Sequence, residues 1–562
     1  MFSNKDISRM FSVYAELLLL HKKDERLANL LSGASYRVRR MDDPVLEMPQ
    51  QQWTELFRPE IKVVLQELKT QQTIEALDEL IQLTPSGLFE MMRIKGLGGK
   101  KLSLLWQTAG IDTIEQLLQA AKKGELKKIR GFGAKTEENI IANIENYFGH
   151  KDRFHFGFVA HTADSLVQGL QKLLKTEWIS LCGEIRRQYL TVAAIEILAA
   201  DVAGKMNLPL LRKYLVIEST DKQQTRAHTL DEIPVIIYHV TKTNFYYELF
   251  NKTGNEAHVK TVLKKIKKKE AWSSEEAIYK EAGLPYIIPE MREDVAEWSF
   301  KHSINDLITD EDIKGVVHNH TTWSDGVDSL AEFAAACKKK KYEYVVISDH
   351  SKNAHYAGGL KEEKLFRQIE EIDKLNKKVA PFKIFKSIEC DILVSGELDY
   401  SPEVLDQLDM VIVSVHQLLK MDEEKATRRL LKAIENPYTT ILGHMTGRQL
   451  LIRPGYPVNF KKIIDACAAN NVVIEINANP YRLDMDWSHL PYALEKGVMI
   501  SINPDAHSIG EIDNIHWGVS AARKGGLTRE MTWNAMGLKE VEQWLAKKNS
   551  RTKTTEVRKL AV

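Results

Sequence analysis

Side chains that can ligate metal ions recur at regular places in the second half of the chain. Each lies at or just after the end of a short apolar run of the kind that forms a buried β-strand. Imidazole nitrogen together with carboxylate oxygen suits manganese, iron or zinc better than calcium. Nine ligands are too many for one ion, so we expect two or three divalent ions with bridging carboxylates. The expected ligands are six histidines, two aspartates and one glutamate: His318, His320, Asp325, His350, Glu389, His416, His444, Asp505 and His507.

These apolar runs alternate with amphipathic stretches over residues 312–545, which is the pattern of an α/β domain. In barrel-like α/β folds the carboxyl ends of the strands meet on one face, so we expect the ligands to converge there. The sixth run differs from the others, because it ends in Glu475 and Asn477. The seven expected strands are 314–317, 344–347, 382–387, 410–413, 439–442, 472–476 and 498–502.

The chemistry expected of such a cluster is hydrolysis of a phosphate ester. Divalent ions lower the pKa of a bound water, supply hydroxide near neutral pH and neutralise the phosphate and the departing oxygen. Asp349 precedes one of the histidines and is a candidate catalytic carboxylate. Arg448 and Arg482 follow the fifth and sixth strands, where they could hold a phosphate by paired hydrogen bonds or serve as structural ion-pair partners.

Two copies of one glycine pattern occur in the first 150 residues, IKGLGGKK at 94–101 and IRGFGAKT at 129–136. The glycines allow a tight turn between two helices, and the second helix then presents free N–H groups that suit a phosphate. One copy would be an ordinary connection between helices, whereas two copies favour contact with a nucleic-acid backbone without base reading. The candidate contact residues are Gly96, Gly98, Lys100, Gly131, Gly133 and Lys135.

Residues 151–300 have the rhythm of a nucleotidyltransferase palm, with a strand, a glycine turn, a basic pair and a second apolar strand. Nucleotidyl transfer needs clustered carboxylates, because two divalent ions must hold the attacking and leaving oxygens. The run TVAAIEIL has Ala194 and Glu196 where two aspartates are expected, and IPVIIYHV has Ile236 at a third such position. One carboxylate does not build a two-ion site, so we expect a palm that keeps its fold and has lost its reaction.

These motifs resemble two known families. The series from His318 to His507 matches the PHP family, the phosphoesterase domains named for polymerases and histidinol phosphatases. CGEIRR, KTGNEAH and EEAIYKEAGLPYIIPEMRED are similar to the palm and thumb motifs of family X DNA polymerases, whose bacterial and archaeal members often carry a C-terminal PHP domain. The resemblance implies an α-helical helix-hairpin-helix region at 1–150, an α+β palm and thumb at 151–300, a distorted seven-stranded α/β PHP barrel at 312–545 and a basic tail at 546–562.

The resemblance also implies a manganese-dependent 3′-5′ exonuclease that acts on DNA ends in repair, with abasic-site or 3′-blocking-group removal as related activities. Zinc and iron are the other candidate ions. The hairpins favour a DNA substrate, because a small phosphomonoester would not need them. Three alternatives stay open: a small-molecule phosphatase of the histidinol phosphatase type, an active family X DNA polymerase if the palm alignment is shifted, and a non-catalytic DNA-binding scaffold.

Composition limits the setting in which this chemistry takes place. The net charge of the 562 residues is +1, so DNA binding must come from local patches rather than from a global field. The four cysteines lack CxxC spacing, which fits a reducing cytoplasm. No apolar run approaches a membrane-spanning length, and we therefore expect a cytoplasmic protein without membrane contact. The sequence does not indicate protein partners.

Overall fold

The chain is divided into two compact units, Met1–Lys151 and Asp152–Val562. The structure, a computed structural model, describes residues 2, 4–39, 41, 43–94, 96–202, 211, 214–266 and 271–560. Within these ranges, no helix combines the length and the apolar character needed to cross a membrane. All four cysteines are buried and free of disulfide bonds.

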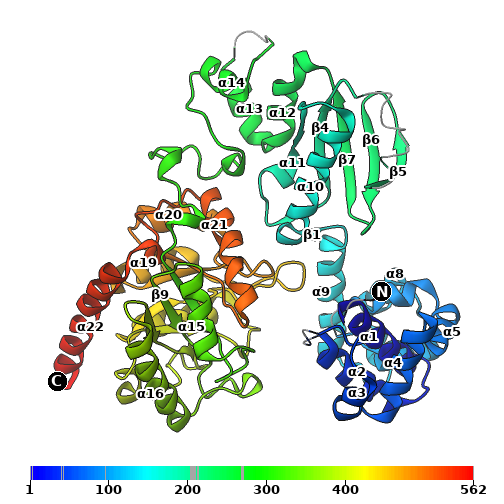
Figure 1. Cartoon of the computed structure of the whole chain (residues 1–562), viewed down its shortest axis with the longest axis horizontal. Coiled ribbons are helices and arrows are strands. Elements are labelled where there is room, and N and C mark those ends of the chain that lie inside the picture. The colour runs from blue at the N-terminus through cyan, green and yellow to red at the C-terminus, as the bar shows by residue number, and fades with distance from the viewer. Residues whose placement is uncertain are drawn as a thin grey trace. The chain divides into compact units, whose positions relative to one another are not determined.

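The N-terminal unit is helical (Figure 1, blue to cyan). Both glycine turns immediately precede a helix: Gly98 caps α7 and Gly133 caps α9. Leucine, isoleucine and aromatic side chains from all parts of the unit form one buried core that includes Phe11, Trp53 and Phe132. The helices are α1 (Asn4–Leu20), α2 (Glu25–Arg39), α3 (Gln50–Leu56), α4 (Pro59–Gln71), α5 (Glu75–Leu83), α6 (Ser86–Met91), α7 (Gly99–Ala109), α8 (Ile114–Lys122) and α9 (Ala134–His150).

The second unit begins with the α+β palm and thumb. A five-stranded sheet has the order β2-β4-β7-β6-β5, in which β4 and β7 are parallel and the other neighbours antiparallel. Helix α10 packs on this sheet through apolar residues spaced three or four positions apart, such as Val159, Ala163 and Leu166. The strands are β1 (Phe154–His155), β2 (Ile179–Leu181), β3 (Thr191–Val192), β4 (Ile195–Ala200), β5 (Leu215–Thr220), β6 (Gln224–Thr229) and β7 (Pro234–Val240). The helices are α10 (Phe156–Leu174), α11 (Gly183–Arg186), α12 (Phe245–Thr253), α13 (Glu256–Leu263) and α14 (Glu275–Glu281).

The rest of the unit is a parallel α/β barrel, and the predicted fold class is confirmed. Its strands form a three-stranded sheet, β10-β9-β8, and a five-stranded sheet, β11-β12-β13-β14-β15. Parallel bridges between Asn319 and Ala506 and between His350 and Glu389 join the two sheets. The third predicted strand continues past a break as a second segment. The strands are β8 (Gly315–Asn319), β9 (Tyr344–Ile347), β10 (Lys383–Lys386), β11 (Glu389–Asp391), β12 (Val411–Ser414), β13 (Thr439–Leu442), β14 (Val473–Asn477) and β15 (Ile500–Asn503).

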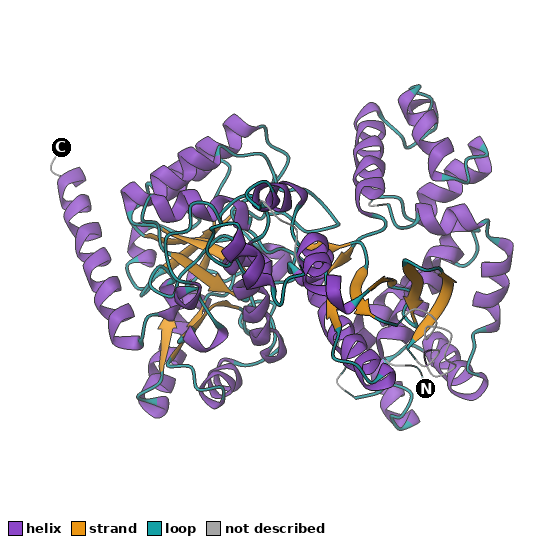
Figure 2. Cartoon of the chain, turned by 90° about the horizontal axis from the view of Figure 1, so that it is seen from above, coloured by secondary structure: helices purple, strands orange, loops and turns teal. Residues whose placement is uncertain are grey.

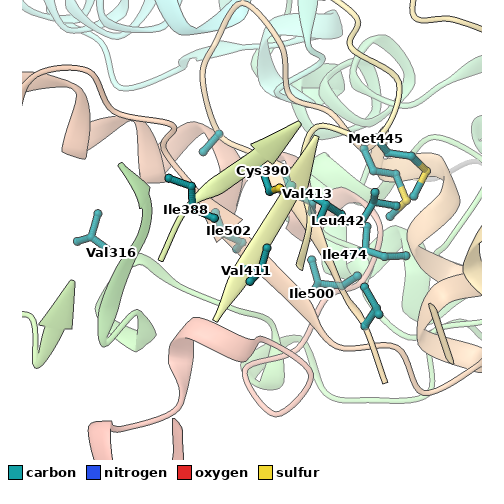
Figure 3. Packing of buried hydrophobic residues seen from close by; sticks show 14 of the residues in the cluster. Val316, Ile388, Cys390, Val411, Val413, Leu442, Met445, Ile474, Ile500 and Ile502 are labelled. Carbon is teal, nitrogen blue, oxygen red and sulfur yellow. The ribbon is translucent and has the colours of Figure 1, made fainter. Parts of the chain in front are cut away.

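Helices surround the strands of the barrel (Figure 2). Strands such as β9 and β12 are buried along their whole length, which explains why they read as continuous apolar runs rather than alternating ones. Figure 3 shows Val316, Val413 and Ile474 among the packed side chains of this core. The helices are α15 (Leu330–Lys339), α16 (Glu362–Val379), α17 (Pro402–Leu405), α18 (Glu423–Ile434), α19 (Phe460–Asn470), α20 (Leu490–Glu495), α21 (Ile515–Lys524) and α22 (Leu538–Leu560).

The basic segment predicted as a separate tail at 546–562 does not begin a new element. Helix α22 starts at Leu538 and continues through this segment to Leu560. Residues 538–560 contain neither glycine nor proline, so nothing in the backbone chemistry stops the helix at 545. The last two residues of the predicted tail lie outside the described residues.

One buried lysine, here called the Lys524 anchor, joins the barrel to the palm and thumb. The Nζ atom of Lys524, at the end of α21, donates hydrogen bonds to the Oε1 of Glu293 at 2.7 Å, to the carbonyl of Arg187 at 2.8 Å and to the carbonyl of Glu290 at 3.1 Å. The side chain is fully buried. These three acceptors match the three donors of the ammonium group, which is how a buried cation is tolerated.

Candidate functional site

The barrel brings the predicted metal ligands together at the carboxyl ends of its strands. Eight of the nine belong to groups whose potential ligand atoms all lie within 4.8 Å of one another. The ninth, His444, has its Nε2 atom 3.0 Å from the Oε1 of Glu389. The three groups are His320 with Asp325, His350 and His507; His318 with His320 and Asp505; and His350 with Glu389 and His416.

The carboxylate of Glu389 is the centre of this arrangement. Its Oε1 lies 3.1 Å from the Nε2 of His318 and 3.1 Å from the Nε2 of His416, while its Oε2 lies 2.9 Å from the Nδ1 of His350. A second carboxylate, that of Asp505, has its Oδ1 3.1 Å from the Nε2 of His320. A carboxylate that faces several imidazoles on two sides has the geometry of a ligand that bridges two ions.

The buried ligand atoms of this cluster have unfilled hydrogen-bonding capacity. Both oxygens of Glu389, both ring nitrogens of His320 and the Nε2 of His318 are buried without a hydrogen-bond partner. Buried polar atoms in native proteins are almost always paired, and unpaired ones need an explanation such as an ion. Divalent ions coordinated by these atoms provide that explanation, so the donor set fits a metal centre.

The backbone of two ligands is strained in a way that aims them into the cluster. His318 and Asp505 have φ angles of +65° and +52°, although neither is glycine. The pairing of β8 with β9 also shifts register between Val316 and Asn319. Such bulges redirect side chains, and residues held in the left-handed region cluster at functional sites. The bulge between these strands therefore helps to direct His318 and His320 toward the cluster.

Two further carboxylates orient histidines of the cluster through their second ring nitrogens. The sequence alone does not assign a role to either of them. The Oε2 of Glu475 forms a 2.6 Å hydrogen bond with the Nδ1 of His318, and the Oδ1 of Asp391 forms a 2.7 Å hydrogen bond with the Nδ1 of His416. Carboxylates that hold the second nitrogen of a metal-binding histidine fix its tautomer and its orientation. Glu389 and Asp391 are two apart on one strand and share a face, which is a signal that could have identified Asp391.

The protonation of the histidines follows from their neighbours. Burial and the adjacent rings of His507 and His350 lower the pKa of His320 to about 3, so this ring is neutral and can bind an ion. Burial alone would lower the pKa of His416, but the carboxylates of Glu389 and Asp391 raise it to about 10. Burial acts in the same direction on His507, yet the carboxylates of Asp325 and Asp505 raise its pKa to about 9. The carboxylates therefore attract positive charge, which protons or metal ions can supply.

We expect manganese binding to tighten as the pH rises from 6 to 8. His416 and His507, with pKa values of about 10 and about 9, are both protonated over this range in the metal-free protein and must lose their protons to bind an ion. Each displaced proton should lower the apparent Kd about tenfold per pH unit. Calorimetric titration with Mn²⁺ in two buffers of different ionisation enthalpy measures both the affinity and the protons released; a Kd independent of pH would contradict this expectation.

Asp349 does not lie with the ligands. Its carboxylate accepts hydrogen bonds from the backbone and hydroxyl of Thr321, each at 2.8 Å, from the hydroxyl of Ser324 at 2.5 Å and from the amide of Gln368 at 2.5 Å. These bonds fix the loop 321–325 that carries Asp325. The geometry gives Asp349 a positioning role, in place of the catalytic role expected from the sequence.

The two candidate arginines are placed differently. Arg448 is committed to the loop after β14: it donates to the Oδ2 of Asp486 at 2.5 Å, to the carbonyl of Arg482 at 2.9 Å and to the carbonyl of Leu483. Arg482 instead extends toward the cluster, with its Nε 3.9 Å from the Oδ2 of Asp505. Only Arg482 therefore has its guanidinium beside a candidate ligand.

The palm strands do not assemble a comparable site. Glu196 lies opposite Ile236 in the parallel pairing of β4 and β7, and its Oε1 accepts a 2.9 Å hydrogen bond from the hydroxyl of Tyr238. Over the described residues, groups of three or more potential ligands occur only in the barrel. The palm keeps the topology that would hold ions, but Ile236 supplies no oxygen.

The arginines of the palm turn are already paired with carboxylates of the thumb. Arg186 donates to both oxygens of Glu275, at 3.0 and 2.5 Å, and Arg187 donates to the Oε1 of Glu293 at 3.0 Å. Glu184 in the same turn accepts from Arg153 at 3.0 Å. The two arginines of this turn thus hold the palm to the thumb, whereas Glu184 pairs within the palm.

The two glycine hairpins of the N-terminal unit are not equivalent. Gly96 and Gly131 both have φ angles, +86° and +98°, that favour glycine. In the first hairpin, the N–H of Gly99 donates to the carboxylate of Glu16, so the anion-binding end of α7 is occupied by the protein itself. In the second, a Cβ added at Gly131 or Gly133 would meet no atom within 4 Å, and Lys135 is exposed.

Charge reversal at Lys135 is therefore expected to weaken DNA binding more than the same change at Lys100. The ammonium of Lys100 forms an ion pair with Glu25 beside the occupied end of α7. We expect Lys135→Glu to raise the Kd for a labelled duplex about tenfold through loss of a phosphate contact. Lys100→Glu is expected to change it by about twofold or less. Fluorescence anisotropy at one fixed salt concentration compares them; equal losses would mean that both hairpins contact DNA.

Known protein families match two parts of the chain. The family of SAM-like helix-hairpin-helix tandems matches residues 89–146, and the PHP domain family matches residues 317–479. The first match indicates DNA binding by the N-terminal unit. The second, together with the ligand groups, identifies the barrel cluster as a divalent-metal centre.

Similar proteins cover most of the chain or its barrel. The DNA polymerase/3′-5′ exonuclease PolX of Bacillus subtilis (strain 168) is 34% identical over 492 residues, which are 84% of this chain and 86% of that protein. A probable phosphatase of Thermoanaerobacter sp. (strain X514) is 27% identical over 248 residues, 41% of this chain and 94% of that protein. Leishmania infantum polymerase beta, solved as a ternary P/T complex, covers 37% of this chain and 98% of its own at 14% identity, with a TM-score of 0.21 that is too low to bear on the fold.

Proposed function

This chain belongs to the PolX family of family X polymerases that carry a PHP domain, and on that premise we propose that it is a metal-dependent phosphodiester hydrolase that shortens DNA strands from their 3′ ends. Removal of abasic sites or of blocking groups at a 3′ end would use the same bond cleavage, and we include these repair activities in the proposal. The reactions differ in the group that leaves, not in the site that they need.

The observation that carries this proposal is the concentration of unpaired, buried ligand atoms around Glu389. The two oxygens of this carboxylate, the Nε2 of His318 and both ring nitrogens of His320 are buried without a hydrogen-bond partner, and the Nε2 atoms of the two histidines lie 3.1 and 3.7 Å from the carboxylate. When bound, divalent ions would supply hydroxide near neutral pH and neutralise the phosphate charge. The DNA-binding hairpins at the other end of the chain favour a polymeric substrate over a metabolite.

The chain's own residues would position the phosphate and the ligands. We assign to Arg482 the contact with a non-bridging phosphate oxygen, because its guanidinium extends toward Asp505. Arg448 holds the loop that carries Arg482, through its bond to the Arg482 carbonyl. Glu475 and Asp391 keep two imidazoles oriented, and Asp349 keeps the loop of Asp325 in place.

Manganese is the ion that we propose for the cluster, with zinc and iron as alternatives. Mixed imidazole and carboxylate ligands suit all three. We place the activity in the cytoplasm, because all four cysteines are buried and unpaired, as in proteins of reducing compartments. We propose that the hairpins contact the DNA backbone rather than base edges, since their glycines offer backbone N–H groups and their lysines offer positive charge, both of which suit phosphate oxygens.

We further propose that the palm no longer synthesises DNA. Only Glu196 remains of the carboxylates that two ions require, and its partner position on the neighbouring strand is Ile236. The arginines that follow the glycine turn are paired with Glu275 and Glu293. The palm would then serve as a scaffold that connects the hairpins to the barrel.

A small-molecule phosphatase is the second candidate function. The observation that favours it is the similarity of the barrel to a probable phosphatase. The matched region is 41% of this chain and 94% of that protein. A protein of that kind would hydrolyse a small phosphomonoester, and the rate of that reaction would not change when the hairpins are altered.

A single assay separates these functions. The purified chain is incubated with Mn²⁺ and a 5′-labelled primer–template, and in parallel with histidinol phosphate as a small phosphomonoester. Stepwise shortening of the primer supports the proposed function. Release of phosphate from histidinol phosphate without any shortening of the primer would replace it with the phosphatase function.

A further inference from the structure

Three aromatic side chains from distant parts of the chain meet where the start of the palm contacts the loop after β14. His155 and Phe158 come from the start of the palm, and Tyr481 comes from the loop after β14. The ring centroids of Phe158 and Tyr481 lie 5.1 Å apart, and His155 lies 5.5 Å from the first and 5.0 Å from the second. We call this group the aromatic ledge.

The ledge is held rigidly by contacts on its inner side. The Nε2 of His155 forms a 3.0 Å hydrogen bond with the carbonyl of Leu450, and the N–H of Leu450 donates to the carbonyl of Tyr481 at 2.7 Å. Gly157, between the two palm residues, packs so closely that an added Cβ would lie 3.0 Å from the Cβ of Pro480. The rings are therefore fixed relative to the barrel loop rather than free to rotate with the palm.

The outer side of the ledge is unusually exposed for aromatic carbon. The side chains of Phe158 and Tyr481 are 52% and 40% exposed. A ring pair that served only to join the palm to the barrel would be expected to lie inside the contact, as Phe156 does against Trp517. Adjacent exposed rings that are fixed in place form a surface on which flat groups can stack.

The position of the ledge points to the flat groups that it would take. Tyr481 precedes Arg482, whose Nε lies 3.9 Å from the carboxylate of the ligand Asp505. A strand whose last phosphodiester lies at Arg482 would have its next nucleotides within reach of the ring on the adjacent residue, Tyr481. Proteins that bind single-stranded nucleic acid combine cationic groups for the backbone with aromatic rings for the bases, which is the combination found here.

Another exposed ring lies next to one of the candidate ligands. Tyr356 is 68% exposed, and its ring centroid lies 6.2 Å from that of His350, a candidate ligand. This ring is placed to contact the terminal nucleotide itself, whereas the ledge is placed to contact those that follow it.

We propose that the aromatic ledge of Phe158 and Tyr481 stacks the unpaired bases that precede the scissile phosphate and so selects single-stranded 3′ ends. This inference rests on the proposed function, because it names the part of the substrate that the hydrolytic site would hold. It gives the palm a part in hydrolysis, since Phe158 and His155 belong to the palm. A blunt duplex would have to unpair before its bases could reach the rings.

The test compares two double variants with the unchanged chain in Mn²⁺. Phe158→Ala/Tyr481→Ala removes both rings, whereas Phe158→Tyr/Tyr481→Phe keeps a stacking surface of the same size. Tyr214→Ala, at a palm residue that is 42% exposed, controls for loss of an exposed aromatic side chain elsewhere. Each protein is assayed on a 5′-labelled single-stranded oligonucleotide, on the blunt duplex, and on thymidine 5′-phosphate p-nitrophenyl ester, which has only one base.

The alanine pair is expected to raise the KM for the oligonucleotide about tenfold, which corresponds to the loss of stacking for about one base. Its turnover of the chromogenic ester should stay unchanged, and its preference for the single strand over the duplex should fall. The Phe158→Tyr/Tyr481→Phe pair should keep the KM for the oligonucleotide and the preference of the unchanged chain. An unchanged KM for the oligonucleotide would overturn the inference. An equal loss of activity on the oligonucleotide and on the chromogenic ester would also overturn it, since that result means that the rings have a structural role.

Failure of the proposed function would look different from failure of this inference. If the unchanged chain does not shorten the oligonucleotide at all, the proposal that it hydrolyses DNA ends is wrong, and the ledge has no such strand to bind. If the unchanged chain and the alanine pair shorten it with the same KM, the DNA hydrolase stands and only the ledge is wrong.

Discussion

A His318→Ala/His320→Ala variant is expected to lose 3′-5′ degradation of a 5′-labelled primer by at least about 10³-fold, because removal of the ions forfeits several kcal/mol of stabilisation of the transition state. The two side chains occupy the strand end from which two of the three ligand groups are built, and His320 belongs to both of those groups. Their loss also removes one imidazole neighbour of Glu389, that of His318, and the imidazole 3.1 Å from Asp505, that of His320. Denaturing gels with Mn²⁺ measure the rate, and mass spectrometry of the purified protein measures the bound metal.

The matched control is His302→Ala, which removes an exposed histidine of the same unit that belongs to none of the ligand groups. It should keep both the metal and the rate. DNA affinity of the double variant should be unchanged, because the hairpins belong to the other unit. Degradation that survives in the double variant would place the hydrolytic site outside the barrel.

The second large effect concerns synthesis, which we expect to be absent. With all four deoxynucleoside triphosphates present, no product longer than the primer should form, because a palm with a single carboxylate cannot hold two ions. We expect the rate of nucleotide addition to be lower by at least about 10⁴-fold than in a palm that holds both ions. Glu196 is opposed by Ile236, and the turn that would face a triphosphate carries Glu184 paired with Arg153. Gel analysis of the labelled primer measures any extension.

The metal-site variant makes this second test decisive. In the unchanged chain, rapid degradation could remove nucleotides as fast as they were added and so hide synthesis. The His318→Ala/His320→Ala variant does not degrade the primer, so any extension would accumulate. Extended primer in that variant would mean that the palm is an active family X polymerase despite Ala194 and Ile236.

The barrel and its ligands could be predicted from the sequence because two simple rules apply to them. A strand buried on both faces is a continuous apolar run, and β9 and β13 coincide with the runs at 344–347 and 439–442. Parallel strands place their carboxyl ends together, so polar residues that follow each run had to meet. The break between β10 and β11 was not predictable, because it depends on how the barrel closes around Glu389.

The roles that the sequence did not reveal depend on contacts between distant segments. The position of Asp349 next to His350 suggests a catalytic carboxylate, yet neighbours on an extended chain point to opposite sides. Glu475 and Asp391 act through histidines that lie 157 and 25 residues away. The occupied end of α7 depends on Glu16, which is 83 residues from Gly99, so no local pattern distinguishes the two hairpins.

The Lys524 anchor has a consequence for how this protein can change over generations. A barrel separated from residues 152–300 would lose the three acceptors that Arg187, Glu290 and Glu293 provide for the Lys524 ammonium. Natural selection for the hydrolase therefore also preserves the polymerase body, whether or not that body synthesises anything. Substitutions at positions 194 and 236 leave these three contacts in place, whereas a substitution of Glu293 removes one of them.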